Sequence, residues 1–220
     1  MFRHVIFDLD GTLVDSARQC IGIVNAMLAD RGSDRRVDAA TARVHMSSGG
    51  QHLVSVLLGT DGGDPAAELA DFRARYQAMP TSREALFPGV AEGVAALRRA
   101  GLTLAICSNK PQHLCENVLA DTGLAPHFAA IVGERPTLRA KPAPDLLLAA
   151  LKELGGDGRA CLYVGDSEID HELARSADIP FCFMTYGYAT PHWSPEAGAS
   201  FGCFPTLVAS IMARLGQVHA

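Results

Sequence analysis

The feature that most constrains this chain is a short apolar run near its beginning that is followed by two carboxylates. Val5 to Phe7 is apolar and rich in strand-forming residues, which predicts a buried strand. Asp8 and Asp10 come next, and side chains two apart on a strand share a face, so both can point into one site. Gly11 then permits a sharp turn. Adjacent carboxylates repel each other unless a cation or a shared proton neutralises them, which favours Mg²⁺; ordinary turn carboxylates are the alternative.

Three later segments place polar side chains at the ends of predicted elements. They are Ser108 and Asn109 after a strand-like run, Lys141 before a proline-rich helix start, and Asp166 with Asp170 after a further strand. Each segment also has a structural explanation. Ser108 and Asn109 could cap a helix that Pro111 opens, Lys141 could be a solvated charge, and the two aspartates could be turn and helix-start acids.

Composition limits the classes of protein to consider. At 220 residues, with 48% apolar residues, the chain can build a substantial core. The net charge of −5 and the lack of a basic block make nucleic acid an unfavoured partner. No apolar run approaches the length of a membrane span. The six scattered cysteines, without a Cys-x-x-Cys pair, are typical of reduced thiols, so we expect a cytoplasmic protein.

The pattern of periodicity divides the chain. Residues 16–86 are predicted to be helical throughout, and Ser16 and Gln19 have the spacing of a capping box. From Pro88 onward, helices alternate with predicted strands at 102–107, 128–132, 161–164 and 179–184, and residues 185–200 are predicted to form a loop. Such alternation predicts an α/β fold with a doubly wound, mostly parallel sheet. Ligands of these sheets bind beyond the carboxyl ends of the strands, where Asp8, Asp10, Ser108 and Asp166 are expected.

The segment Asp8-Leu9-Asp10-Gly11-Thr12 resembles the first motif of the haloacid dehalogenase superfamily. Ser108, Lys141 and the run from Gly165 to Asp170 resemble its other three motifs, in the family's order, so that the resemblance covers nearly the whole chain. It implies a Rossmann-like catalytic core, formed by residues 1–15 and 87–220, with an inserted helical cap domain at 16–86.

The resemblance also implies a role for each matching residue. Asp8 would be the nucleophile that forms an aspartyl-phosphate, and Asp10 the general acid–base. Ser108 would donate a hydrogen bond to a phosphoryl oxygen, with the Asn109 amide beside it, and Lys141 would supply positive charge.

Metal and turn residues follow from the same motifs. Asp8, the Asp10 carbonyl and Asp166 would hold Mg²⁺, and Asp170 would ligate it or support it through water. Gly11 and Thr12 are expected to contribute turn or backbone phosphate contacts. Lys110 and Asp15 are expected to lie outside the site.

The first motif and the run from Thr185 to Tyr188 are similar to those of bacterial phosphoglycolate phosphatases, which implies a small phosphorylated metabolite, best 2-phosphoglycolate, as substrate. That branch carries a Gly-x-Gly loop in its cap; here Ser47-Ser48-Gly49-Gly50 stands in its place, and Ser48 and Gly49 are expected to contact substrate. Residues 16–86 contain no lysine, which argues against a phosphonate hydrolase, and Asp10 argues against a dehalogenase.

Other functions stay open. They are a phosphosugar phosphatase, a phosphoglucomutase-like phosphotransferase, a receiver-like signalling module and a silent binding protein. We expect a monomer or homodimer without nucleic-acid or membrane partners.

Overall fold

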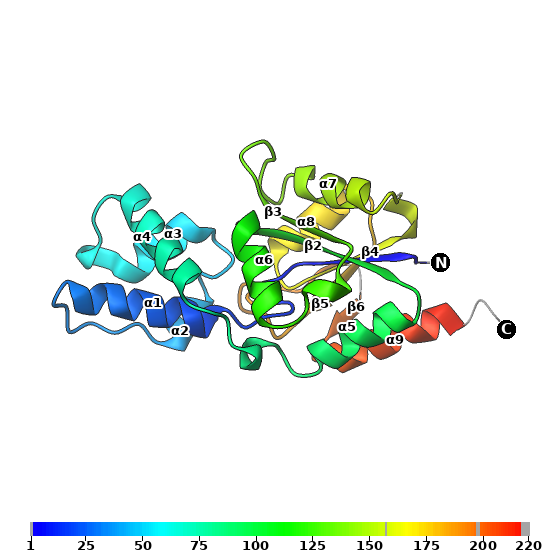
Figure 1. Ribbon diagram of the computed structural model, residues 1–220, viewed down its shortest axis with the longest axis horizontal. Helices are drawn as coiled ribbons and strands as arrows, with labels where there is room; N and C mark the ends of the chain where they lie inside the picture. The colour runs from blue at the N-terminus through cyan, green and yellow to red at the C-terminus, as the bar shows by residue number, and fades with distance from the viewer. Residues whose placement is uncertain (1, 157, 197–198, 217–220) are drawn as a thin grey trace. The chain divides into compact units, whose positions relative to one another are not determined.

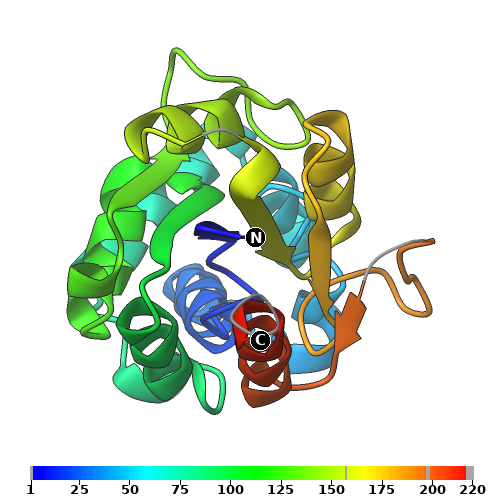
Figure 2. The ribbon, with the colours of Figure 1, turned by 90° about the vertical axis from the view of Figure 1, so that its right-hand side faces the viewer.

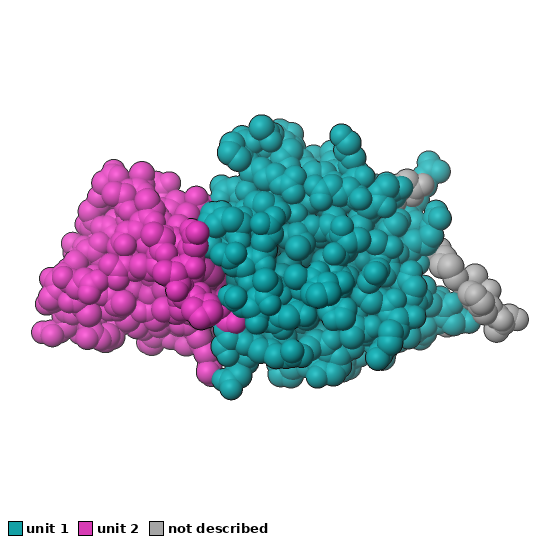
Figure 3. All heavy atoms as spheres, viewed as in Figure 1, with its two compact units in different colours: residues 1–15, 82–220 teal, residues 16–81 magenta. Residues whose placement is uncertain are grey.

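The structure is a computed structural model that describes residues 2–156, 158–196 and 199–216. The chain divides into two compact units, which Figure 3 colours separately. Unit 1 comprises Met1–Asp15 and Ser82–Ala220, and unit 2 comprises Ser16–Thr81. Residues 82–86 group with unit 1 because the backbone there is bonded to the segment after the first strand: Asp15 donates to the Ala85 carbonyl and Phe87 to the Leu13 carbonyl.

The described part of unit 1 contains one sheet of six strands, all parallel, which confirms the predicted doubly wound sheet (Figures 1 and 2). The order is β3-β2-β1-β4-β5-β6. The strands are β1 (His4–Phe7), β2 (Thr103–Pro111), β3 (Ala130–Glu134), β4 (Cys161–Gly165), β5 (Phe181–Met184) and β6 (Ala199–Phe201). The prediction of a loop over 185–200 is wrong at its end, where β6 begins. Three residues without alternation carry no strand pattern.

Helices cover both faces of this sheet (Figure 2). On one face, α7 (Asp145–Glu153) and α8 (Glu168–Ser176) enclose a core that includes Ile6, Tyr163 and Phe181. On the other face, α5 (Val90–Arg99) packs against α9 (Phe204–Gly216). The helix α6 (Gln112–Asp121) contacts β2 and β3. Short 3-10 helices complete the unit at Arg83–Ala85, Ala125–His127 and Gly158–Ala160.

The strand order reverses at β1, which lies between β2 and β4. At such a point the connections on either side lead away in opposite directions and leave a crevice beyond the carboxyl ends of the strands. Asp8 and Asp10 follow β1, and Asp166 follows β4. The fold therefore brings residues more than 150 positions apart in sequence to one edge of the sheet.

Strand β2 is longer than the pattern predicts. It continues to Pro111, with an irregular register against β3 between Cys107 and Pro111. The prediction that the strand ends at Cys107 is therefore wrong, and Ser108, Asn109 and Lys110 lie in its irregular last part. The polar residues after Cys107 hid this extension, because a buried strand is recognised by its apolar run.

Unit 2 is helical, with α1 (Ala17–Asp30), α2 (Ala39–Arg43), α3 (Gly50–Leu58) and α4 (Pro65–Ala78), and a 3-10 turn at Gly59–Asp61. The capping-box prediction at its start is wrong. Ser16 has helical backbone angles and makes no side-chain cap bond, and the Gln19 amide donates instead to the Met79 carbonyl. A cap needs an extended backbone at the first position, which Ser16 lacks.

No helix in the described part of the chain is both long and apolar enough to cross a membrane.

Candidate active site

Asp8 lies at the middle of the carboxyl edge of the sheet. Phe7, the last residue of β1, pairs with Ile106 on one side and Val164 on the other, and the Asp8 amide donates to the Val164 carbonyl at 2.9 Å. The Asp8 side chain is consequently enclosed by strands on both sides, and the residue is only 8% exposed. A carboxylate held this way has a fixed position and little water around it.

Three aspartates converge there. Asp8, Asp166 and Asp170 each offer one carboxylate oxygen, and these oxygens lie within 4.8 Å of one another. Burial raises the pKa of Asp8 to about 6, against the opposing effect of Lys141, and burial also raises the pKa of Asp166 well above its usual value. The crowding makes a nearby positive charge necessary.

Lys141 supplies part of that charge. Its Nζ lies 2.9 Å from Asp8 Oδ1 and 2.7 Å from Asp170 Oδ1, in a buried position. Burial by itself lowers a lysine pKa, but the Asp170 and Asp8 carboxylates outweigh it and raise the pKa of Lys141 above its usual value. The side chain is therefore an ammonium ion.

Asn109 fixes the backbone that carries this lysine. Its side-chain oxygen accepts from the Lys141 amide at 2.7 Å, and its side-chain nitrogen donates to the Lys141 carbonyl at 3.1 Å. This pair of bonds ties the end of β2 to the loop before α7. Ser108, which precedes Asn109, is buried and accepts a bond from the Lys110 amide at 3.3 Å.

Asp170 is fully buried, and protein donors surround its carboxylate. Oδ2 accepts from the Ser167 hydroxyl at 2.6 Å and from the Asp166 amide at 3.2 Å. Oδ1 accepts from Lys141 at 2.7 Å and from the Tyr163 hydroxyl at 3.1 Å. Since each oxygen has about two acceptor positions, these four bonds engage the carboxylate completely. Asp170 thus holds the lysine and the turn that carries Asp166.

Asp166 is held from both sides. Its Oδ1 accepts from the Thr12 hydroxyl at 2.8 Å and its Oδ2 from the Tyr188 amide at 2.7 Å. A Cβ at Gly11 or at Gly187 would come within 2.2 Å of an atom of Asp166, so only glycine fits at either position. The Gly11 amide donates to the Val14 carbonyl at 2.8 Å, which makes Gly11 a turn residue.

The expectation that Lys110 lies outside the site is wrong, and the same expectation for Asp15 stays a prediction. Lys110 Nζ lies 2.9 Å from Asp10 Oδ2, and the Tyr188 hydroxyl donates to Asp15 at 2.8 Å. Lys110 reaches Asp10 because β2 continues past Ser108 toward the turn after β1. Asp15 is joined to the loop after β5, a contact for which the sequence offers no signal.

Tyr163 and Ser167 also belong to the network, and both were missed. Tyr163 stands two residues before Gly165 on β4, and its burial raises its pKa well above the usual value, so it is a neutral phenol. The alternation of side chains along β4 could have revealed Tyr163, because Tyr163 and Gly165 are two residues apart and point to the same face of the strand.

Two predicted substrate residues, Ser48 and Gly49, lie in unit 2. Ser48 is exposed, and Gly49 stands at the N-terminus of α3 with a φ of 86°, a conformation that favours glycine. Gly49 therefore has a clear structural role in its loop.

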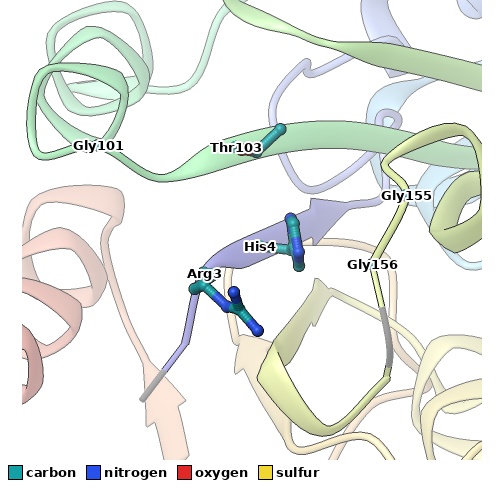
Figure 4. A pocket seen from close by; sticks show the side chains of 6 residues that line it. All are labelled: Arg3, His4, Gly101, Thr103, Gly155 and Gly156. Carbon is teal, nitrogen blue, oxygen red and sulfur yellow. The ribbon is translucent and has the colours of Figure 1, made fainter.

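A separate hollow of about 520 Å³ lies near the beginnings of β1 and β2 (Figure 4). The aspartates lie beyond the opposite ends of the strands. The hollow is lined by Arg3, His4, Gly101, Thr103, Gly155 and Gly156. This lining contains no carboxylate and none of the predicted site residues, so the hollow is not part of the aspartate site.

Comparison with known proteins agrees with this geometry. The model of the haloacid dehalogenase-like hydrolase family matches residues 2–178. The plasmid phosphoglycolate phosphatase of Cupriavidus necator is 38% identical over 199 residues, which cover 89% of this chain and 86% of that protein. An N-acetylmuramic acid 6-phosphate phosphatase of Pseudomonas putida is 35% identical over 197 residues, covering 88% and 87%.

The fold has solved counterparts. The crystal structure of CbbY from Rhodobacter sphaeroides, in complex with phosphate, has a TM-score of 0.77 at 24% identity, covering 94% of this chain and 96% of that one. At this identity the likeness concerns the fold, and the family model and the closer relatives carry the assignment. The chain belongs to the haloacid dehalogenase-like hydrolases, as its motifs predict, and is a phosphoric monoester hydrolase.

Proposed function

We propose that this protein hydrolyses 2-phosphoglycolate through an aspartyl-phosphate formed on Asp8. The observation that carries the chemistry is the buried Asp8 carboxylate 2.9 Å from the Lys141 ammonium, at the switch point of the sheet. The choice of 2-phosphoglycolate as substrate is supported by the relatives of this chain, several of which are named phosphoglycolate phosphatases and are 32–38% identical to it.

In the first half of the proposed reaction, a carboxylate oxygen of Asp8 attacks phosphorus and the bond to the alcohol oxygen breaks. Asp10 gives its proton to that oxygen, so that the alcohol leaves neutral. Lys141 offsets the charge on the phosphoryl oxygens, and Ser108 and the Asn109 amide donate hydrogen bonds to them. In the second half, Asp10 takes a proton from water, which attacks the aspartyl-phosphate and releases inorganic phosphate and free Asp8.

The site fits Mg²⁺. The donors are oxygens only, from buried carboxylates whose pKa values are raised by burial and by the neighbouring carboxylates, and such a set suits a hard divalent cation. Asp8, Asp166 and the Asp10 carbonyl would hold the ion, with Asp170 supporting it from behind because its oxygens already accept four protein bonds. The ion would screen the dianionic substrate from the anionic nucleophile.

We further propose that the helical unit acts as a cap over the substrate, with Ser48 and Gly49 in the loop that selects it. Closure of such a unit would exclude water from the aspartyl-phosphate and restrict the cavity to a small metabolite. Two hydroxyls at Ser47 and Ser48 could bond a substrate carboxylate or sugar hydroxyl. A cytoplasmic location and a monomeric or dimeric state stay predictions.

A second candidate substrate is a 6-phosphorylated amino-sugar acid. The Pseudomonas putida and Pseudomonas aeruginosa relatives are N-acetylmuramic acid 6-phosphate phosphatases at 35% and 33% identity, close to the values for the phosphoglycolate enzymes. Both substrates combine a phosphate monoester with a carboxylate, which is the chemistry that the serine pair would recognise.

The test is kcat/KM, with Mg²⁺, for 2-phosphoglycolate beside N-acetylmuramic acid 6-phosphate, glucose 1-phosphate, glycerol phosphates and nucleoside monophosphates. We expect 2-phosphoglycolate to be at least about tenfold better than the others, a difference of roughly 1.4 kcal/mol in transition-state binding. A smaller margin would reject 2-phosphoglycolate as the preferred substrate, and only the assignment of the protein to the phosphatases would remain. Recovery of a hexose 6-phosphate from glucose 1-phosphate would identify a mutase instead.

A further inference from the structure

Tyr163 joins three of the four sequence motifs through one hydroxyl. The residue is on β4, and its side chain is fully buried against the core below the site. Its oxygen lies 3.4 Å from Lys141 Nζ, 3.1 Å from Asp170 Oδ1 and 3.2 Å from the carbonyl of Cys107, the residue before Ser108.

The protons of Lys141 show what this hydroxyl does. An ammonium group has three N–H bonds, and Lys141 has three neighbouring acceptors: Asp170 at 2.7 Å, Asp8 at 2.9 Å and the Tyr163 hydroxyl at 3.4 Å. Two of these acceptors are carboxylates and compete for the same charge. The third acceptor is neutral and completes the set of three that the ammonium N–H bonds can meet.

We propose that Tyr163 is a positioning residue, whose hydroxyl holds the Lys141 ammonium in place against Asp8 and anchors the backbone that presents Ser108. The inference rests on the proposed function, in which Lys141 stabilises the phosphoryl charge and Asp8 attacks phosphorus. The hydroxyl donates its one proton to Asp170 or to the Cys107 carbonyl, so it ties the lysine to whichever of the two accepts it. Tyr163 touches no reacting atom in this scheme.

Loss of the hydroxyl should affect turnover more than folding. Phenylalanine keeps the ring, which stacks on Phe181 with centroids 6.4 Å apart in an apolar core. Lys141 would keep its two carboxylates but lose the neutral acceptor, and would shift toward the closer of them, Asp170. An interaction needed chiefly in the transition state lowers kcat and leaves KM unchanged.

The test compares wild type, Tyr163→Phe and Tyr76→Phe on the best substrate, with the folded fraction of each measured by circular dichroism at the assay temperature. Tyr76 is a matched control, because it is a buried tyrosine that packs against Phe72 in unit 2. We expect Tyr163→Phe to lower kcat about tenfold, with KM within twofold and full folding, and Tyr76→Phe to keep wild-type kcat.

The outcomes separate this inference from the proposed function. If wild type is active, Asp8→Asn is inactive and Tyr163→Phe keeps kcat within twofold of wild type, the positioning role is wrong and the mechanism stands. A fall in kcat that merely matches a fall in folded fraction, or that comes with an equal rise in KM, also rejects it. If wild type hydrolyses no phosphate monoester, or Asp8→Asn is active, the proposed function fails and the inference fails with it.

Discussion

Lys110 Nζ lies 2.9 Å from Asp10 Oδ2, with the lysine side chain 8% exposed and the aspartate side chain 23% exposed. Lys110 lies in β2 and Asp10 in the turn after β1, and the two meet at the carboxyl edge of the sheet. The other oxygen of Asp10, Oδ1, is buried and accepts no hydrogen bond from the described residues. The lysine therefore holds one oxygen of the proposed general acid in place.

Lys110→Met should lower turnover by about tenfold through misplacement of Asp10. The loss should be greater for alkyl phosphates than for p-nitrophenyl phosphate, because the nitrophenolate leaves without needing a proton. Steady-state kcat on both substrates measures this, with Lys152→Met as control, since Lys152 is exposed on α7. An equal loss on both substrates would mean that Lys110 serves some step other than proton transfer.

Asp8→Asn should abolish turnover, because an amide cannot attack phosphorus. Asp10→Asn should cost about 10²–10⁴-fold, the usual range for general acid–base catalysis. Acid-quenched protein incubated with ³²P-labelled substrate should carry label in wild type and none in Asp8→Asn. Near-normal turnover in Asp8→Asn would require another nucleophile.

Mg²⁺ should be required for activity and should stabilise the fold. EDTA should abolish turnover, and Ca²⁺ should bind but support it poorly, because its looser coordination misplaces the nucleophile. A ligand at 100 times its Kd stabilises the folded state by about 2.7 kcal/mol. Urea unfolding with and without Mg²⁺ should therefore show a stabilisation of this order in wild type and little in Asp166→Asn. Full activity in EDTA would contradict the metal assignment.

The buried Asp8 should make the metal-free protein less stable as pH rises. Its pKa is raised from 3.8 to about 6, so the folded state binds this proton more tightly than the unfolded state. That stability is complete below about pH 4 and is lost as pH rises through about 6. The Asp8→Asn variant does not lose stability in this way, because its amide does not ionise. Its free energy of unfolding relative to wild type should therefore increase between pH 4.5 and pH 8, by about 2 kcal/mol.

Urea titrations of both proteins in EDTA at the two pH values test this prediction. Carboxylates remote from Asp8 titrate in wild type and variant alike, so the difference between the two proteins reports Asp8 together with its electrostatic coupling to Asp166. A difference that is constant or shrinks with pH would show that the Lys141 ion pair outweighs burial at this site.

The fold and the main site residues could be predicted because each depends on a local pattern. Asp8 and Asp10 follow an apolar strand, and parallel strands bring their carboxyl ends together. Lys141 matches the family's lysine motif, and its Nζ lies 2.9 Å from Asp8 Oδ1.

The supporting contacts could not be predicted, because they join segments with no pattern in common. Thr12 and Tyr188 meet on Asp166 although 176 positions separate them, and nothing local marks either as a partner. The contact between Lys110 and Asp10 depends on where β2 ends. The capping role of Ser16 depends on a backbone conformation that the capping-box spacing does not reveal. Tertiary packing decides such details, and in each case it overrode the local preference.

Gly187 offers a sharp test of how tightly Asp166 is held. A Cβ there would lie 2.2 Å from Asp166 Cβ, and Asp166 is 1% exposed and bonded on both oxygens, so it cannot move aside. Gly187→Ala should therefore displace Asp166 or the Tyr188 amide, lowering the free energy of unfolding by about 1–3 kcal/mol and turnover by far more. Gly202→Ala is the control, because the nearest atom to its Cβ, Thr185 Oγ1, would be 3.9 Å away. Urea unfolding and kcat for both variants decide the matter: if Gly187→Ala is as stable and as active as Gly202→Ala, Asp166 is not confined in the way that the contacts indicate.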